Sequence, residues 1–159
     1  TRILIESMPS ILEKFPDAHL QIVGEGEDYA VLDGIIKEKK LGNRIELIGK
    51  IDHSELRFYY SSCDLYISAS TFEVCPVPTL EAMACGKPLA LSDIEPHREM
   101  INASKAGKIF SKSEPTEISM VVSEVFQDKN NLGILGRKFA ESHDWTVISK
   151  QMAKIFESV

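Results

Sequence analysis

One stretch decides how this sequence folds: Ser70-Thr71-Phe72-Glu73-Val74-Cys75-Pro76-Val77-Pro78-Thr79-Leu80-Glu81-Ala82-Met83-Ala84-Cys85-Gly86-Lys87-Pro88. It follows a strand candidate, Asp64-Leu65-Tyr66-Ile67-Ser68. Pro78 predicts a helix start, because the fixed φ of proline suits the first helical turn. Glu73 is then expected on the loop at the carboxyl end of the strand, and Glu81 on the first or second turn of the helix. Open α/β sheets bind their ligands at this edge.

The residue types in this stretch suit a phosphorylated ligand that carries hydroxyl groups. Amides at a helix start attract phosphate, and carboxylates accept hydrogen bonds from sugar hydroxyls. The plainer alternative is an ordinary strand, loop and helix with two solvated glutamates.

Outward from this stretch, strands and helices alternate. Further strands are predicted at His19–Val23, Arg44–Gly49, Leu89–Leu91 and Lys108–Phe110. Such alternation indicates a parallel sheet with helices on both faces and right-handed crossovers. The 159 residues suit one domain with one core. The fold class predicted is α/β, a doubly wound parallel sheet over residues 1–159.

The helices are predicted from hydrophobic spacing and from start and stop signals. The first helix contains Pro9, which predicts a kink or a split. The next has Tyr29, Leu32, Ile35 and Ile36 facing inward and stops at Gly42. Asp52 and Glu55 have the spacing of a capping box. Further helices are predicted from Pro115 through Phe126 and around 132–140 and 147–156.

Composition excludes several classes of function. A net charge of −6 and a pI near 5.3 argue against a nucleic-acid surface or a polybasic membrane patch. The three cysteines lack Cys-x-x-Cys spacing, which favours reduced thiols in a cytoplasmic protein. The sequence has no Asp-x-Asp pair, and its four histidines are scattered, so no metal site is predicted.

The central stretch resembles the donor-binding motif of retaining glycosyltransferases of the two-domain GT-B type, in the large family 4 group. Their pattern is Glu, seven residues, Glu, then Ala-Met-Ala-Cys-Gly-x-Pro, and it is matched here from Glu73 to Pro88. Gln21–Gly26, Ile45–Gly49 and His143–Trp145 match the family's other segments in order. The resemblance therefore spans nearly the whole chain.

This resemblance implies a Rossmann-like domain that forms one half of a GT-B fold, the carboxyl-terminal half that binds a nucleoside diphosphate-sugar donor. The family's first strand, with an arginine and a lysine that hold the diphosphate, is expected before Thr1, so the sheet is expected to lack that central strand. The acceptor, and any membrane contact, would belong to a missing amino-terminal domain. The 159-residue chain alone is expected to be inactive. The full-length protein is expected in the cytoplasm, with peripheral contact at the inner face of the membrane left open.

Residue roles follow from the same resemblance. Glu73 would contact the transferred sugar as the catalytic-site carboxylate, and Glu81 would bind the ribose of a UDP-, GDP- or ADP-sugar. The other predicted donor-binding residues are Val74, Cys75, Val77 and Thr79 near the phosphates, Lys50 and Ile51 beside the base, and Gly24 in a Gly-x-Gly turn. Neither a cofactor nor a metal is expected.

One departure from the family pattern bears on the phosphates. The family has Gly-Phe-Gly after the first glutamate, where this chain has Val74-Cys75-Pro76. Proline has no amide hydrogen, so Pro76 and Pro78 each remove a possible phosphate donor. A weaker or shifted diphosphate contact is expected.

Two alternatives stay open beside the transferase. The first is a non-catalytic nucleotide-sugar binding or regulatory module that keeps the glutamates. The second is a signalling receiver domain, which needs an aspartate at the carboxyl end of a central strand. Asp64 precedes its strand, which disfavours the second alternative.

Overall fold

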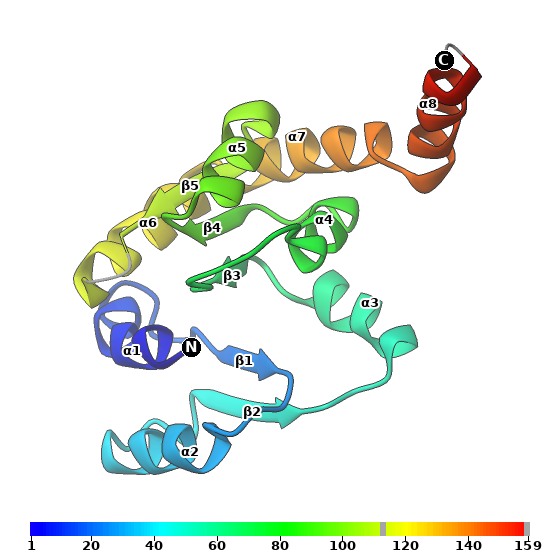
Figure 1. Ribbon diagram of the computed structural model, residues 1–159. Coiled ribbons are helices and arrows are strands. Elements are labelled where there is room, and N and C mark those ends of the chain that lie inside the picture. The colour runs from blue at the N-terminus through cyan, green and yellow to red at the C-terminus, as the bar shows by residue number, and fades with distance from the viewer. Residues whose placement is uncertain (112–113, 158–159) are drawn as a thin grey trace.

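The computed structural model describes residues 1–111 and 114–157. Its five strands are β1 (Leu20–Val23), β2 (Ile45–Gly49), β3 (Tyr66–Ser68), β4 (Leu89–Ser92) and β5 (Gly107–Phe110). All the strand pairs are parallel, and a helix connects each strand to the next (Figure 1). The predicted α/β class is confirmed.

Eight helices lie in the described part of the chain. They are α1 (Arg2–Lys14), α2 (Tyr29–Glu38), α3 (His53–Ser62), α4 (Val77–Ala84), α5 (Glu95–Ser104), α6 (Pro115–Gln127), α7 (Lys129–Ser142) and α8 (Trp145–Glu157).

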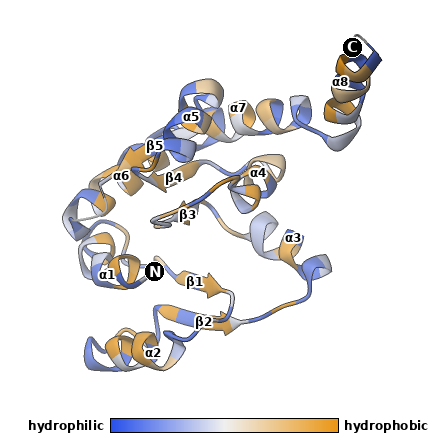
Figure 2. Ribbon diagram, viewed as in Figure 1, coloured by the Kyte–Doolittle hydropathy of each residue, from blue (hydrophilic) through white to orange (hydrophobic). Residues whose placement is uncertain are grey.

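Strand β4 is buried on both faces, as a central parallel strand should be. Its side chains alternate between two hydrophobic clusters: Leu89 and Leu91 pack with residues of α4, α5 and α7, whereas Ala90 packs in the cluster that contains α1 and α6. Helices therefore cover both faces of this sheet. The strands β1, β2 and β4 are mostly hydrophobic (Figure 2).

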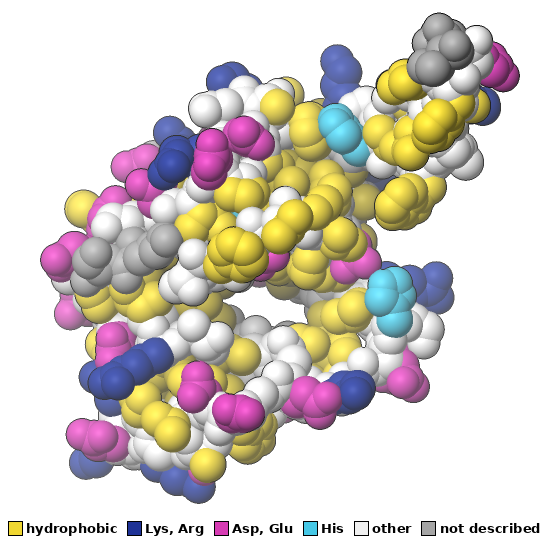
Figure 3. Space-filling model, in the orientation of Figure 1, with side chains coloured by type: hydrophobic (Ala, Val, Ile, Leu, Met, Phe, Trp, Pro, Cys, Tyr) yellow, Lys and Arg dark blue, Asp and Glu magenta, His cyan; other side chains and the backbone are white. Residues whose placement is uncertain are grey.

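The strands form two separate sheets, ordered β1-β2 and β3-β4-β5. Within the described residues, no ladder joins the two sheets, and the space-filling view is hollowed between them (Figure 3). Helix α1 connects them through the core, because its buried Ile5, Met8 and Ile11 belong to one cluster with Ile45 of β2 and Phe110 of β5.

Several predicted details of the helices were wrong. Pro9 lies inside a single helix α1, so the helix is not split and the kink stays a prediction; the buried Met8 and Ile11 on either side of Pro9 hold both parts in the core. Helix α2 ends at Glu38, before Gly42, because Lys40 itself adopts a left-handed φ of 57°. Tyr29 is exposed, since it stands at the first position of α2.

Two aspartates stand at helix starts, and they behave differently. Asp52 occupies the N-cap position of α3 but makes no side-chain cap bond, so the capping box is not formed. Asp144 does accept the amide of Thr146 through Oδ1 at 2.8 Å before α8. The hydrogen bonds from Thr146 hold the pKa of Asp144 below its usual value.

Helix α8 projects from the rest of the chain (Figure 1). None of its described residues is buried, although it carries the large apolar side chains of Trp145, Met152 and Phe156. Nowhere in residues 1–111 and 114–157 is there a helix with the length and apolar character needed to cross a membrane.

The turn after α4 packs closely on α7, because Gly86 in this turn and Gly133 in α7 face each other. Gly86 stops α4 with a φ of 70°, which glycine adopts without steric cost. A Cβ atom added at Gly133 of α7 would lie 2.3 Å from the Gly86 carbonyl oxygen. The backbone contact therefore requires glycine at position 133.

We predict that Gly133→Ala lowers the free energy of unfolding by about 1–3 kcal/mol, because α7 must move away from the backbone of α4. Gly34→Ala is the matched control: Gly34 also lies in a helix, but nothing approaches an added Cβ there. This control should gain up to about 1 kcal/mol from helix propensity. Urea denaturation measures both, and equal stability of the two variants would contradict the close contact.

Candidate functional site

The candidate site lies at the carboxyl end of β3, where the sequence predicted it. Glu73 is on the loop between β3 and α4, and Glu81 is the fifth residue of α4, in its second turn. Both glutamates are partly buried. The structure therefore confirms their placement on loop and helix, and the sugar and ribose roles stay predictions.

A chain of hydrogen bonds fixes the loop that carries Glu73. The Ser70 hydroxyl donates to Glu73 Oε1 at 2.7 Å, and the hydroxyl of Ser92, at the end of β4, donates to the Ser70 carbonyl at 2.5 Å. His97 of α5 lies beneath, with Nδ1 3.0 Å from the Ser92 carbonyl. Ser92 and His97 are fully buried. The Glu73 carboxylate is thus held from the sheet side through Ser70.

The proline at position 76 reshapes the start of α4. With φ −78° and ψ 70°, Pro76 has the geometry of an inverse γ-turn, and the Val77 amide donates to the Cys75 carbonyl at 2.8 Å. The Thr79 amide donates to the Pro76 carbonyl at 3.0 Å. Both amides had been predicted to face phosphate, and in this structure the tight turn engages them instead.

The remaining predicted phosphate residues, Val74 and Cys75, lie on the exposed part of this loop. Val74 and Phe72 are among the most exposed large apolar side chains of the described residues, at 83% and 78%. Val74 and Cys75 are therefore exposed on the loop between Glu73 and α4, whereas Pro76, which follows them, is buried.

The Glu81 carboxylate is held by two side chains of α3. The Tyr60 hydroxyl donates to Oε2 at 3.0 Å, and His53 Nε2 lies 3.1 Å from Oε1. Burial, together with the hydrogen bond to Glu81, raises the pKa of Tyr60 far above its usual value, so this phenol stays protonated and donates. Burial also raises the pKa of Tyr66, whose ring centroid lies 5.9 Å from that of Tyr60.

Gly24, Lys50 and Ile51 lie at the carboxyl ends of β1 and β2, on the other sheet. The Gly24 amide donates to the Gly49 carbonyl at 2.9 Å, so it extends the strand pairing and does not point to a ligand. Lys50 pairs with Glu25 at 3.0 Å, and both side chains are exposed. Ile51 precedes His53 by two residues, so the contact of His53 with Glu81 brings the loop after β2 to the candidate site.

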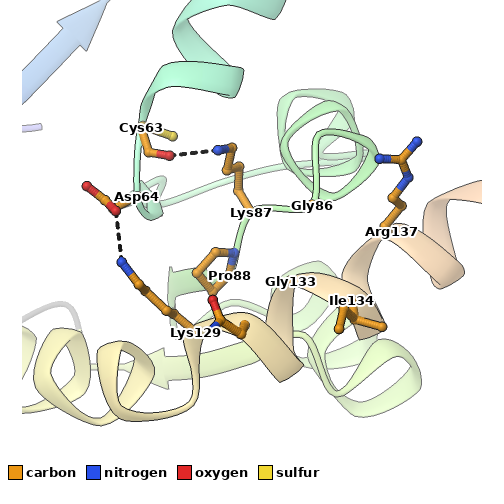
Figure 4. A pocket seen from close by; sticks show the side chains of 10 residues that line it. Cys63, Asp64, Gly86, Lys87, Pro88, Lys129, Gly133, Ile134 and Arg137 are labelled. Atoms are coloured by element: carbon orange, nitrogen blue, oxygen red, sulfur yellow. Dashed lines mark hydrogen bonds and ion pairs between the residues drawn. The ribbon is translucent and has the colours of Figure 1, made fainter.

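A shallow hollow of about 510 Å³ lies elsewhere (Figure 4). It contains residues that immediately precede β3 and β4, among them Asp64 and Pro88, so it is at the opposite end of the sheet from Glu73. Its lysines are engaged: Lys87 donates to the carbonyls of Ser61 and Cys63 at 2.8 Å, and Lys129 pairs with Asp64 at 2.9 Å. These contacts fasten α3 and α7 to the strands.

Within residues 1–111 and 114–157, the structure contains no group of three or more His, Cys, Asp or Glu side chains placed to hold a metal ion.

Comparison with known proteins identifies the family. The family model described as glycosyl transferases group 1 matches residues 2–143. This chain belongs to that family. The resemblance inferred from Glu73 to Pro88 is confirmed.

Curated relatives of this group 1 chain include a synthase and a mannosyltransferase. It is 28% identical to an alpha-monoglucosyldiacylglycerol synthase of Acholeplasma laidlawii, over 84% of the chain and 33% of that protein. It is 23% identical to a phosphatidyl-myo-inositol mannosyltransferase of Mycolicibacterium smegmatis, over 99% of the chain and 41% of that protein. The chain thus spans less than half the length of these relatives.

Solved structures share the fold over the whole chain. The sucrose-phosphate synthase of Thermosynechococcus elongatus matches with a TM-score of 0.82 at 24% identity, covering 99% of this chain and 42% of that one. HepE of Anabaena in complex with UDP matches with a TM-score of 0.85 at 22% identity, covering 100% of this chain and 45% of that one.

The side chains that support the two glutamates were not predicted from the sequence. His53 and Tyr60 are seven residues apart, so they lie on one face of α3, a spacing that is visible in the sequence. Their contact with Glu81 depends on how α3 packs beside α4, which the sequence does not show. His97 was missed because α5 was not predicted, and the bond of Ser92 to Ser70 was missed because it depends on how the end of β4 packs beside the loop after β3.

We predict that iodoacetamide alkylates Cys75 several-fold faster than Cys63 at pH 8. Cys75 is exposed, whereas burial raises the pKa of the Cys63 thiol and lowers its thiolate fraction. Peptide mass spectrometry measures both rates in one sample, and the difference should narrow as the pH rises toward the Cys63 pKa. Equal rates at pH 8 would show that the loop around Cys75 is covered.

Proposed function

We propose that this chain is the donor-binding domain of a retaining glycosyltransferase, which transfers a sugar from a nucleoside diphosphate-sugar to an acceptor hydroxyl. The observation that carries the proposal is the pair of carboxylates, Glu73 on the loop after β3 and Glu81 on α4, at the edge where α/β sheets bind ligands. Family membership supports it, as do the UDP complexes of similar solved structures.

In this proposal Glu81 binds the ribose hydroxyls and Glu73 the hydroxyls of the transferred sugar. A charged carboxylate is a strong acceptor for adjacent hydroxyl groups. Glu81 can serve this purpose because its side chain is 28% exposed and its Oε1 lies 3.1 Å from the exposed His53. Glu73 is positioned by Ser70, so its carboxylate is oriented before the sugar arrives.

Negative charge develops on the departing diphosphate, and the protein must stabilise it. The amides of Val77 and Thr79 are engaged in the turn at Pro76, so we assign phosphate contact to the Val74 and Cys75 amides. The family's arginine and lysine, outside this chain, would supply the positive charge. The loop alone should therefore hold the diphosphate weakly.

The split sheet supports the proposal that the domain contains one more strand. Helix α1 precedes β1. A strand before α1 would be connected to β1 through α1 as a right-handed crossover, and it would lie parallel to β1. The side of β1 that faces β3 is available for that pairing among the described residues.

We assign the exposed apolar side chains of α8 to contact with the rest of the longer polypeptide, including an amino-terminal acceptor domain. Amphipathic helices gain most of their stability from packing.

The three cysteines are free thiols, which agrees with the cytoplasmic location that we propose for the enzyme.

A non-catalytic nucleotide-sugar binding module is the second candidate, because the engaged amides of Val77 and Thr79 weaken the phosphate site. Turnover of a UDP-, GDP- or ADP-sugar by the full-length protein separates the two candidates.

We predict different effects of removing the charge from the two glutamates. Glu81→Gln should weaken UDP binding by about 1–3 kcal/mol, because the ribose is present in donor and product alike. Glu73→Gln should lower kcat with little change in UDP affinity, because Glu73 contacts only the transferred sugar. Calorimetry and turnover of the full-length protein measure both quantities.

The control for this pair is Glu38→Gln, the same change on the exposed end of α2. It should leave both affinity and turnover unchanged. Loss of UDP affinity in the Glu73 variant, with none in the Glu81 variant, would reverse the assigned roles.

We further propose that donor binding needs no divalent metal. Amides and basic side chains can stabilise the diphosphate without one. We predict that EDTA changes the UDP affinity of the full-length protein less than twofold in calorimetry. A tenfold loss in EDTA that Mg²⁺ or Mn²⁺ restores would refute metal independence.

A further inference from the structure

The environment of Glu81 is asymmetric. Its Oε2 accepts from Tyr60, which is partly buried against Tyr66, whereas its Oε1 faces His53, the first residue of α3. The side chain of His53 is 85% exposed. One oxygen therefore has a fixed partner, and the other has a partner that a ligand can displace.

The two partners come from one face of one helix. Residues seven apart are two helical turns apart, so Tyr60 and His53 reach the two carboxylate oxygens from different heights along α3. None of the described residues of α3 is fully buried. These two contacts, and those of Lys87 with the carbonyls of Ser61 and Cys63, hold this helix against its neighbours.

We propose that Tyr60 is the positioning residue of the nucleotide site: it fixes the Glu81 carboxylate through Oε2 so that Oε1 can accept a ribose hydroxyl in place of His53. This inference rests on the proposed function, in which Glu81 binds the ribose. A glutamate side chain has several rotatable bonds, and holding one oxygen in advance reduces the freedom lost when the ligand binds. Tyr60 acts through Glu81 and does not contact the nucleotide.

The test compares two ligands that differ only in the ribose hydroxyls. UDP, GDP and ADP are first titrated into the full-length protein, and the tightest is paired with its 2′,3′-dideoxy counterpart. The measured quantity is the ratio of the two affinities in each variant. Because both ligands meet the same protein sample, this ratio does not depend on the fraction of the variant that is folded.

Tyr60→Phe should lower the ratio about fivefold, the effect expected for one hydrogen bond, by weakening only the ligand that has the hydroxyls. Tyr59→Phe is the matched control, the same change one residue earlier and about 100° around the helix; it should leave the ratio unchanged. His53→Ala should not lower the ratio, because the ribose hydroxyl takes the place of His53 on Oε1, and any weakening through the loop after β2 affects both ligands alike.

Several results would overturn the inference. An unchanged ratio in Tyr60→Phe would exclude the action of Tyr60 through Glu81. If both ligands are weakened equally, which also leaves the ratio unchanged, Tyr60 would contribute to stability alone. Selective weakening of the ribose ligand by His53→Ala would show that His53 binds the nucleotide itself. By contrast, a wild-type protein that binds none of the nucleotides, or does not distinguish the pair, would contradict the proposed function.

Discussion

The carboxylate of Glu81 is the contact on which the arrangement of the candidate site depends. Helix α3 follows β2 of the first sheet, and α4 follows β3 of the second sheet. Tyr60 and His53 of α3 meet Glu81 of α4 through the two carboxylate oxygens. With the two sheets unpaired in the described residues, this contact helps to bring the loop after β2, with Lys50 and Ile51, to the carboxyl end of β3.

The same contact explains how one residue can serve both structure and ligand binding. A carboxylate that is partly buried without a hydrogen-bond partner is costly, and the Tyr60 hydroxyl is such a partner for Glu81. The second oxygen faces the exposed side chain of His53, and in the proposed function a ribose hydroxyl takes the place of His53 there. On the neighbouring loop, by contrast, the Val77 amide donates to the Cys75 carbonyl in the inverse γ-turn at Pro76, so it is not available to a phosphate. In the proposed function, the domain is therefore better arranged to bind the sugar and ribose hydroxyls than the diphosphate.

Local signals in the sequence predicted the parts that depend on local physics. Pro78 and Gly86 bracketed α4 because proline suits the first turn and glycine takes a positive φ at the end. The end of α2 was predicted wrongly, since Lys40 adopts the left-handed conformation that glycine usually takes. Helix α5 was missed although Pro96 stands in its first turn, because its segment is mostly polar and its large apolar side chains are few, namely Met100 and Ile101. The contacts of Tyr60 with Glu81 and of Ser92 with Ser70 join residues 21 and 22 positions apart, and only tertiary packing brings them together.

The most direct measurement of the central claim is a crystal structure of the full-length protein with a bound nucleoside diphosphate-sugar. The account predicts a ribose hydroxyl at Glu81 Oε1 in place of His53, Tyr60 still on Oε2, and the sugar against Glu73. A nucleotide bound instead in the hollow beside Lys87 and Lys129, with Glu81 still on His53, would contradict the account.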